Sequence, residues 1–123
     1  MSQICRFDPR RGPECYQQIE IELRHLADLL TITLHATRVV VFGSYARHDL
    51  HEGSDIDLLV VGDFPCRFHH RPMMIRELTN LPVEAICYTP GEFSEIMERG
   101  NWFLEDILTQ GHDLLPLRTE MLP

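Results

Sequence analysis

The stretch that decides the fold is VVVFGSYAR over residues 39–47, continued by HEGSDIDLLVV over residues 51–61. Its two apolar, mostly β-branched runs are typical of buried strands. Between them we expect a Gly-Ser turn and a short helix over residues 44–50. Because successive side chains of a strand point to opposite faces, Asp55 and Asp57 at the start of the second run should share one face.

Helices and strands alternate along the rest of the chain. Apolar residues recur at three-to-four spacing from Tyr16 to Leu30, which predicts an amphipathic helix that begins at Pro13. Thr89 and Glu92 are spaced as a capping box, which should start a helix at the next residue. Further helices are expected to begin near Pro72 and Trp102, and further strands over residues 83–88 and, at an edge, 112–117.

The expected order, α-β-α-β-α-β-α, predicts an α/β (α+β) fold with a small mixed sheet covered by helices. At 123 residues the chain is long enough to form one hydrophobic core. We expect a loose lead-in over residues 1–12, one domain over residues 13–117 and a tail over residues 118–123.

The composition limits the chemistry. All 11 basic residues are arginines and the formal charge is −8, so the acidic surface disfavours binding to nucleic acid. The absence of lysine excludes a P-loop, which needs a lysine to reach the phosphates. The chain shows neither an apolar run that could span a membrane nor the pattern of a signal peptide, and its four cysteines lack C-x-x-C spacing. We therefore expect a cytoplasmic protein with reduced thiols.

Gly43 and Ser44 mark the point where the first strand should give way to a helix. Glycine permits close backbone approach, and a helix N-terminus offers unpaired N–H groups that bind phosphate. The alternative is an ordinary strand–helix turn with Ser44 as its N-cap. Arg47, one turn further on, could bind a phosphate or form an ion pair with a nearby carboxylate.

The aspartate pair favours a metal site. Like charges so close together raise each other's pKa unless a cation lies between them. Mg²⁺ is the expected cation, because it takes hard oxygen ligands and leaves positions for substrate phosphates. Glu84 could join Asp55 and Asp57 as a metal ligand or as a base if its strand neighbours theirs. The alternatives are aspartates that cap a turn and a solvated glutamate on an edge strand.

Gly43-Ser44, ten further residues and then Asp55-Ile56-Asp57 resemble the G-S-x10-D-x-D signature of the DNA polymerase β-like nucleotidyltransferases. The resemblance extends over roughly residues 14–116 and includes a carboxylate, Glu84, on a third strand. It implies that Gly43 and Ser44 hold the phosphates of the donor and that the two aspartates bind metal. The third carboxylate of the family is more often aspartate, so Glu84 is a departure from the family pattern.

In length the chain resembles the minimal nucleotidyltransferases (MNT), many of which pair with a helical HEPN protein in toxin–antitoxin modules. This resemblance implies an NTP donor such as ATP, two Mg²⁺ ions and a hydroxyl that attacks the α-phosphate, in this case a hydroxyl on a HEPN-type partner. One alternative is an antitoxin that acts by binding alone. Another is an antibiotic-type, small-molecule nucleotidyltransferase, which would need a homo-oligomer to complete its acceptor pocket.

Overall fold

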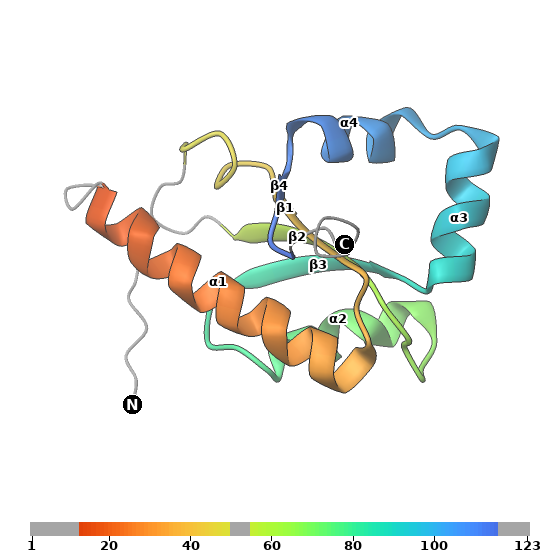
Figure 1. The fold of residues 1–123 in the computed structure, drawn as a ribbon, viewed down its shortest axis with the longest axis horizontal. Helices are drawn as coiled ribbons and strands as arrows, with labels where there is room; N and C mark the ends of the chain where they lie inside the picture. Colours follow the sequence, from red (N-terminus) through yellow and green to blue (C-terminus); the bar gives the residue numbers. More distant parts are fainter. Residues whose placement is uncertain (1–12, 50–54, 116–123) are drawn as a thin grey trace, which may run out of the picture.

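Four strands form one mixed sheet in the order β3-β2-β1-β4 (Figure 1). The structure is a computed structural model that describes residues 13–49 and 55–115. The elements in chain order are α1 (Pro13–Leu34), β1 (Arg38–Phe42), β2 (Ile56–Val61), the 3-10 turn η2 (Phe68–His70), α2 (Arg71–Arg76), β3 (Val83–Tyr88), α3 (Pro90–Arg99), α4 (Trp102–Gln110) and β4 (His112–Asp113). The predicted class, a helix-covered mixed sheet, is confirmed. The lead-in, the turn over residues 51–54 and the tail lie outside the described residues.

The register of the central strands sets the positions of the acidic residues. β2 runs antiparallel to β1 and parallel to β3. At the start of β2, Asp57 pairs with Phe42 of β1 on one side and with Glu84 of β3 on the other. Register partners point to the same face of a sheet, so these three side chains stand side by side.

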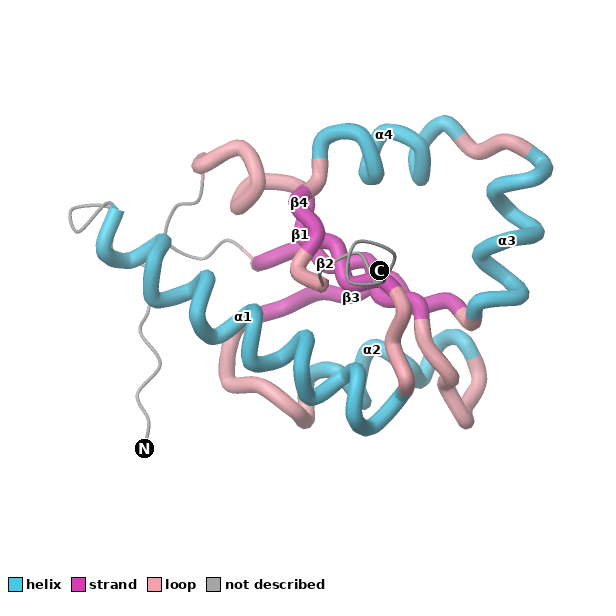
Figure 2. The backbone as a smooth tube through the Cα atoms, in the orientation of Figure 1, coloured by secondary structure: helices cyan, strands magenta, loops and turns pink. Residues whose placement is uncertain are grey.

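Helices cover both faces of the sheet (Figure 2). α1 and α2 pack on one face and α3 and α4 on the other. Because the strands are buried on both sides, they read as continuous apolar runs rather than as alternating ones. Fully buried side chains on the first face include Leu23, Leu26, Leu30, Val41, Leu58 and Ile75, and those on the second include Val40, Leu59 and Leu104.

The predicted apolar stripe of α1 is confirmed, and the helix continues to Leu34, one turn beyond it. Tyr16 and Ile19 at its start and Leu30 near its end all face the core. No helix within residues 13–49 and 55–115 has the combination of length and apolar character that a membrane crossing requires.

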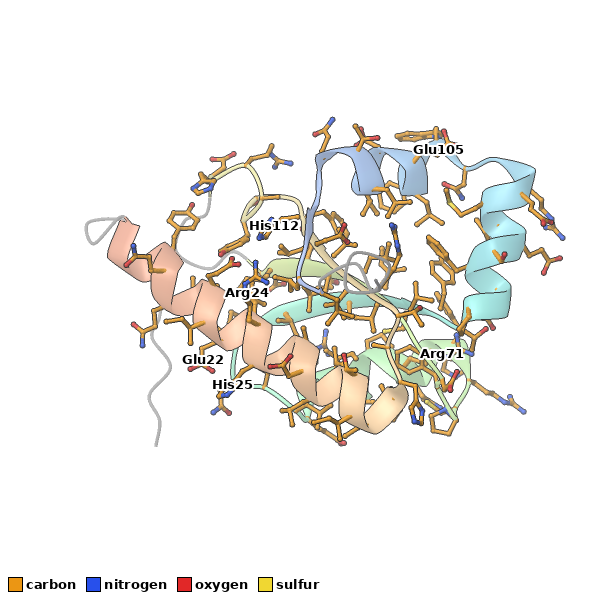
Figure 3. All side chains as sticks on the ribbon, viewed as in Figure 1. Glu22, Arg24, His25, Arg71, Glu105 and His112 are labelled. Atoms are coloured by element: carbon orange, nitrogen blue, oxygen red, sulfur yellow. The ribbon has the colours of Figure 1, made fainter. Side chains whose placement is uncertain are left out.

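The capping box at the start of α3 is also confirmed. The Glu92 backbone N–H donates to Thr89 Oγ1 at 3.2 Å, and the Thr89 N–H donates to Glu92 Oε1 at 3.0 Å. The same carboxylate accepts from the guanidinium of Arg71, which is only 6% exposed, at 2.6 Å. Arg71 also donates to the carbonyls of Cys66 and Cys87 at 3.0 and 3.3 Å. One buried arginine therefore joins α2, the end of β3 and α3 (Figure 3).

Cys87 lies in the core as predicted, and it and Cys66 are free thiols. Burial raises the pKa of the Cys87 thiol to about 12. At neutral pH this sulfur is therefore protonated and packs as a small apolar group.

The helix predicted over residues 44–50 is wrong over residues 44–49, the part that the structure describes, so the described elements begin α-β-β instead of α-β-α. Residues 43–48 form successive turns. The N–H groups of Arg47, His48 and Asp49 donate to carbonyls four, three and five residues back, a mixed pattern that no regular helix shows. His48 has a φ of 57°, which ends any right-handed run.

Two other elements are shorter than predicted. Residues 66–80, where a helix was expected to begin near Pro72, form only the 3-10 turn and the six-residue α2, and Pro72 lies in the first turn of α2 as expected. The edge strand is limited to two residues, with Val41 paired to His112 and Val40 to Asp113. Its outer part from residue 116 onward lies outside the described residues.

Candidate active site

Asp57 and Glu84 are neighbours on the face of the sheet that α4 covers. Each lies two residues before a side chain, Leu59 or Ile86, that packs in the apolar cluster of that face. The alternation of a strand then fixes the direction of both carboxylates. The strand that contains Glu84, β3, is therefore the neighbour of β2, as a shared site with Asp57 requires. Asp55 is exposed and immediately precedes β2.

The pKa of the Asp57 carboxyl is raised above its ordinary value. Burial is the largest cause, followed by the negative charges of Glu84 and Asp55, and the nearby charge of Arg47 opposes them. Both other predicted carboxylates therefore act electrostatically on Asp57. This is the repulsion that a divalent cation would relieve.

The donor set fits a hard divalent cation through the adjacent pair, Asp57 and Glu84, because both offer carboxylate oxygens. Across the part of the chain that the structure describes, however, no three His, Cys, Asp or Glu side chains stand in a metal-holding arrangement.

Gly43 brings the backbone after β1 directly against Asp57. It has a φ of 74°, in the left-handed region that favours glycine. A Cβ placed on it would collide with Oδ2 of Asp57. Two independent constraints therefore require glycine at position 43: its positive φ and the close approach of the Asp57 carboxylate.

A tether to α1 holds the turns that follow Gly43. Tyr45 is 6% exposed, and its hydroxyl donates to Glu20 Oε1 at 2.6 Å. The other Glu20 oxygen lies 2.9 Å from Arg24 Nε and 3.2 Å from His112 Nε2, where α1 meets β4 (Figure 3). Burial and the bond to Glu20 raise the pKa of Tyr45, so it stays a hydrogen-bond donor. This contact, rather than local helix propensity, shapes the segment that contains Ser44 and Arg47.

A cavity of about 290 Å³ lies between these turns and α4. Four of the predicted site residues line it: Gly43, Ser44, Arg47 and Asp57. Asp55 and Glu84 are not among its lining residues, although Glu84 stands next to Asp57.

The opposite wall of the cavity was missed by the sequence analysis. It consists of Phe103, Asp106, Ile107 and Gln110, all from α4. Their spacing along one helix face was a usable signal, but without knowledge of which strands α4 covers it could not be connected with the Gly-Ser turn.

Comparison with known proteins places the chain in a family. The model of the nucleotidyltransferase domain family matches residues 24–112, well over half of the chain. This chain therefore belongs to the nucleotidyltransferase domain family. Membership supports a role in nucleotidyl transfer with an NTP as substrate.

A solved structure agrees with this assignment at the level of the fold. A proposed nucleotidyltransferase from Sulfolobus solfataricus superimposes with a TM-score of 0.54, over 69% of this chain and 79% of that chain. The two sequences are 23% identical, so the likeness concerns the fold. No curated protein matches the chain significantly.

Proposed function

We propose that this chain is a Mg²⁺-dependent nucleotidyltransferase that moves AMP, or another NMP, from an NTP to a hydroxyl group. The observation that carries the proposal is the contact of Gly43 with Asp57, together with Glu84 as the register neighbour of Asp57. It sets a backbone turn suited to phosphates directly against carboxylates suited to a divalent cation.

Each residue of the site has a role in this proposal. The backbone N–H groups of Gly43 and Ser44 and the guanidinium of Arg47 bind the phosphates of the donor. Asp55 and Asp57 would hold Mg²⁺, which when bound would neutralise phosphate charge and lower the pKa of a coordinated hydroxyl, and Glu84 would be either a third ligand or the base.

The reaction forms one bond and breaks another at the α-phosphorus. The acceptor oxygen bonds to this phosphorus, and the bond to the bridging oxygen breaks, so that pyrophosphate leaves. The hydroxyl proton passes to a base. Glu84 is exposed beside Asp57, and we assign this role to it.

For the acceptor we propose a hydroxyl on a HEPN-type protein partner in the cytoplasm, with this chain as the antitoxin. The formal charge of −8, without any lysine, suits a partner that has a basic surface better than it suits nucleic acid.

The test is transfer of label from ATP marked at the α-phosphate to the partner, in the presence of Mg²⁺. Wild-type protein and the control Asp28→Asn, an exposed aspartate of α1, should transfer equally. The double variant Asp55→Asn/Asp57→Asn should not transfer. Equal transfer by the double variant would sink the proposal.

A second candidate is an antitoxin that neutralises its partner by binding alone. The observation that favours it is that Asp55, Asp57 and Glu84 do not stand in a metal-holding arrangement in the described chain. If binding alone suffices, the double aspartate variant co-expressed with the partner still forms the complex and still protects cells. Loss of protection with the complex intact would exclude this candidate.

A further inference from the structure

α4 forms the wall of the cavity that faces Gly43 and Asp57. Three of its lining residues, Phe103, Asp106 and Gln110, fall at positions i, i+3 and i+7 and so share one face of the helix. In Figure 1 this helix lies above β1 and β4, on the face of the sheet that it shares with α3.

Packing fixes the distance of α4 from β1. Leu104 and Ile107 are 1% and 3% exposed and pack with Val40 of β1. A Cβ built on Gly111, which ends α4, would lie 2.5 Å from both Ile107 O and Val40 Cγ1. Only glycine permits an approach this close, so α4 packs directly on β1 at this point.

The two sides of the cavity differ in charge. Among the described residues that line the cavity, Arg47 is the cation, and it lies on the side of Gly43 and Ser44. On the opposite side, α4 presents the carboxylate of Asp106. A triphosphate is attracted to Arg47 and repelled by Asp106, so the nucleoside end of a bound NTP points toward α4. Asp57, the other lining carboxylate, belongs to the pair suited to a cation.

We infer that α4 recognises the nucleoside of the donor NTP; this inference rests on the function proposed above. Phe103 is 43% exposed, and its ring is fixed edge-to-face on Phe42 at 6.3 Å and 88°. It offers an apolar surface on which a base packs. Asp106 Oδ1 accepts from Gln110 Nε2 at 2.9 Å, which orients the carboxylate. The carboxylate then accepts a hydrogen bond from a donor group of the nucleoside, either a ribose hydroxyl or an exocyclic amine.

The test is equilibrium binding by the full chain, in the presence of Mg²⁺, of ATP, 2′-deoxy-ATP and inosine triphosphate. The deoxy analogue lacks a ribose hydroxyl, and inosine lacks the exocyclic amine, so the two arms identify the donor group. Trp102 is the single tryptophan of the chain and lies next to Phe103, with ring centroids 6.1 Å apart. Its fluorescence reports binding without any turnover.

Wild-type protein should bind ATP about tenfold more tightly than one of the analogues, and Asp106→Asn should abolish that preference. Phe103→Leu should weaken the binding of all three nucleotides about tenfold. Glu105→Gln, an exposed neighbour on α4 outside the cavity lining, is the matched control and should behave as wild type.

Each outcome decides. Unchanged selectivity in Asp106→Asn, or equal wild-type affinity for the three nucleotides, would overturn the role of α4 and leave the proposed function standing. If wild-type protein binds none of them, the role of α4 is overturned, and so is ATP as the donor of the proposed reaction. Selectivity that depends on Asp106, without label transfer to any partner, supports the inference and rejects the catalytic proposal.

Discussion

Two charged clusters lie at opposite ends of β3, and they differ in how far their charges are compensated. At the C-terminal end, buried Arg71 is paired with Glu92 and bound to two backbone carbonyls. At the N-terminal end, Glu84 stands beside Asp57, with two like charges in register. The pair of Arg71 and Glu92 stabilises the fold, whereas the repulsion between Asp57 and Glu84 destabilises it.

The pKa shifts express this difference. The hydrogen bond from Arg71 is the largest cause that holds the pKa of Glu92 below its usual range. Burial and the charges of Glu84 and Asp55 raise the pKa of Asp57 instead. A carboxylate that lowers the stability of the fold is retained where function requires it, which is why strained titratable groups gather at functional sites.

The largest effect is expected for Asp57→Asn. Nucleotidyl transfer should fall about a thousandfold, because the site loses several kcal/mol of charge stabilisation. Stability should not fall, since the substitution removes a repelled carboxylate. Transfer of labelled ATP and thermal unfolding measure the two quantities. A variant that loses stability along with activity would show that Asp57 supports the fold.

Gly43→Ala should destabilise the chain by about 2 kcal/mol and abolish transfer, because it adds strain at a positive φ and a clash with Asp57. Gly100→Ala separates the two causes: its φ is 85°, but its Cβ would meet open space, so about 1 kcal/mol is expected. Chemical denaturation gives both values. Equal losses for the two variants would mean that the approach of Asp57 is not close.

Glu92→Gln should destabilise the fold by about 2 kcal/mol because the buried guanidinium of Arg71 loses its counter-charge. This value is below that for fully buried pairs, since the Glu92 side chain is 43% exposed. The control is Glu95→Gln, which breaks an exposed pair with Arg99 and should cost no more than about 0.5 kcal/mol.

The same pair predicts a pH dependence. The pKa of Glu92 in the fold lies below its ordinary value of 4.5. Its contribution to stability is therefore complete above that pH and is lost as pH falls through the lower folded pKa. The difference between wild type and Glu92→Gln in urea unfolding should shrink below pH 4.5. A constant difference would show that lost contacts, not lost charge, cause it.

The smallest effect is expected for Tyr45→Phe, which removes the hydrogen bond to Glu20 and should cost about 1 kcal/mol of stability. Looser turns around Ser44 should also weaken ATP binding severalfold. Tyr88→Phe is a matched control, because the Tyr88 hydroxyl makes no hydrogen bond within the described residues. Unfolding and nucleotide titrations on both variants measure the effect. Unchanged ATP affinity in Tyr45→Phe would show that the hydrogen bond from Tyr45 to Glu20 does not affect the nucleotide site.

The sequence was most informative where local rules decide the structure. The three apolar strands, the capping box at Thr89 and the direction of Asp57, opposite to that of Ile56, follow from side-chain period and backbone hydrogen bonding. The pairing of Asp57 with Glu84 was open, because chain order does not decide which strands become neighbours.

Tertiary contacts decided the rest. The segment after Gly43 was predicted as a helix, but the bond of Tyr45 to Glu20, a residue 25 positions earlier, overrides that local preference. The α4 wall depends on how a helix docks on a sheet face. No short-range sequence pattern encodes the distance between α4 and β1, which depends on the close approach at Gly111.

The parallel register of β2 and β3 also restricts how this chain can vary in evolution. A deletion of one residue that shifted β3 would turn Glu84 toward the face packed by α1 and α2 and bring Ala85 beside Asp57. Substitution of Glu84 by aspartate would leave the carboxylate on the same face of the sheet, on a side chain that is one methylene shorter. Insertions and deletions should therefore be confined to the connections between the elements, while β2 and β3 keep their length and change only by substitution.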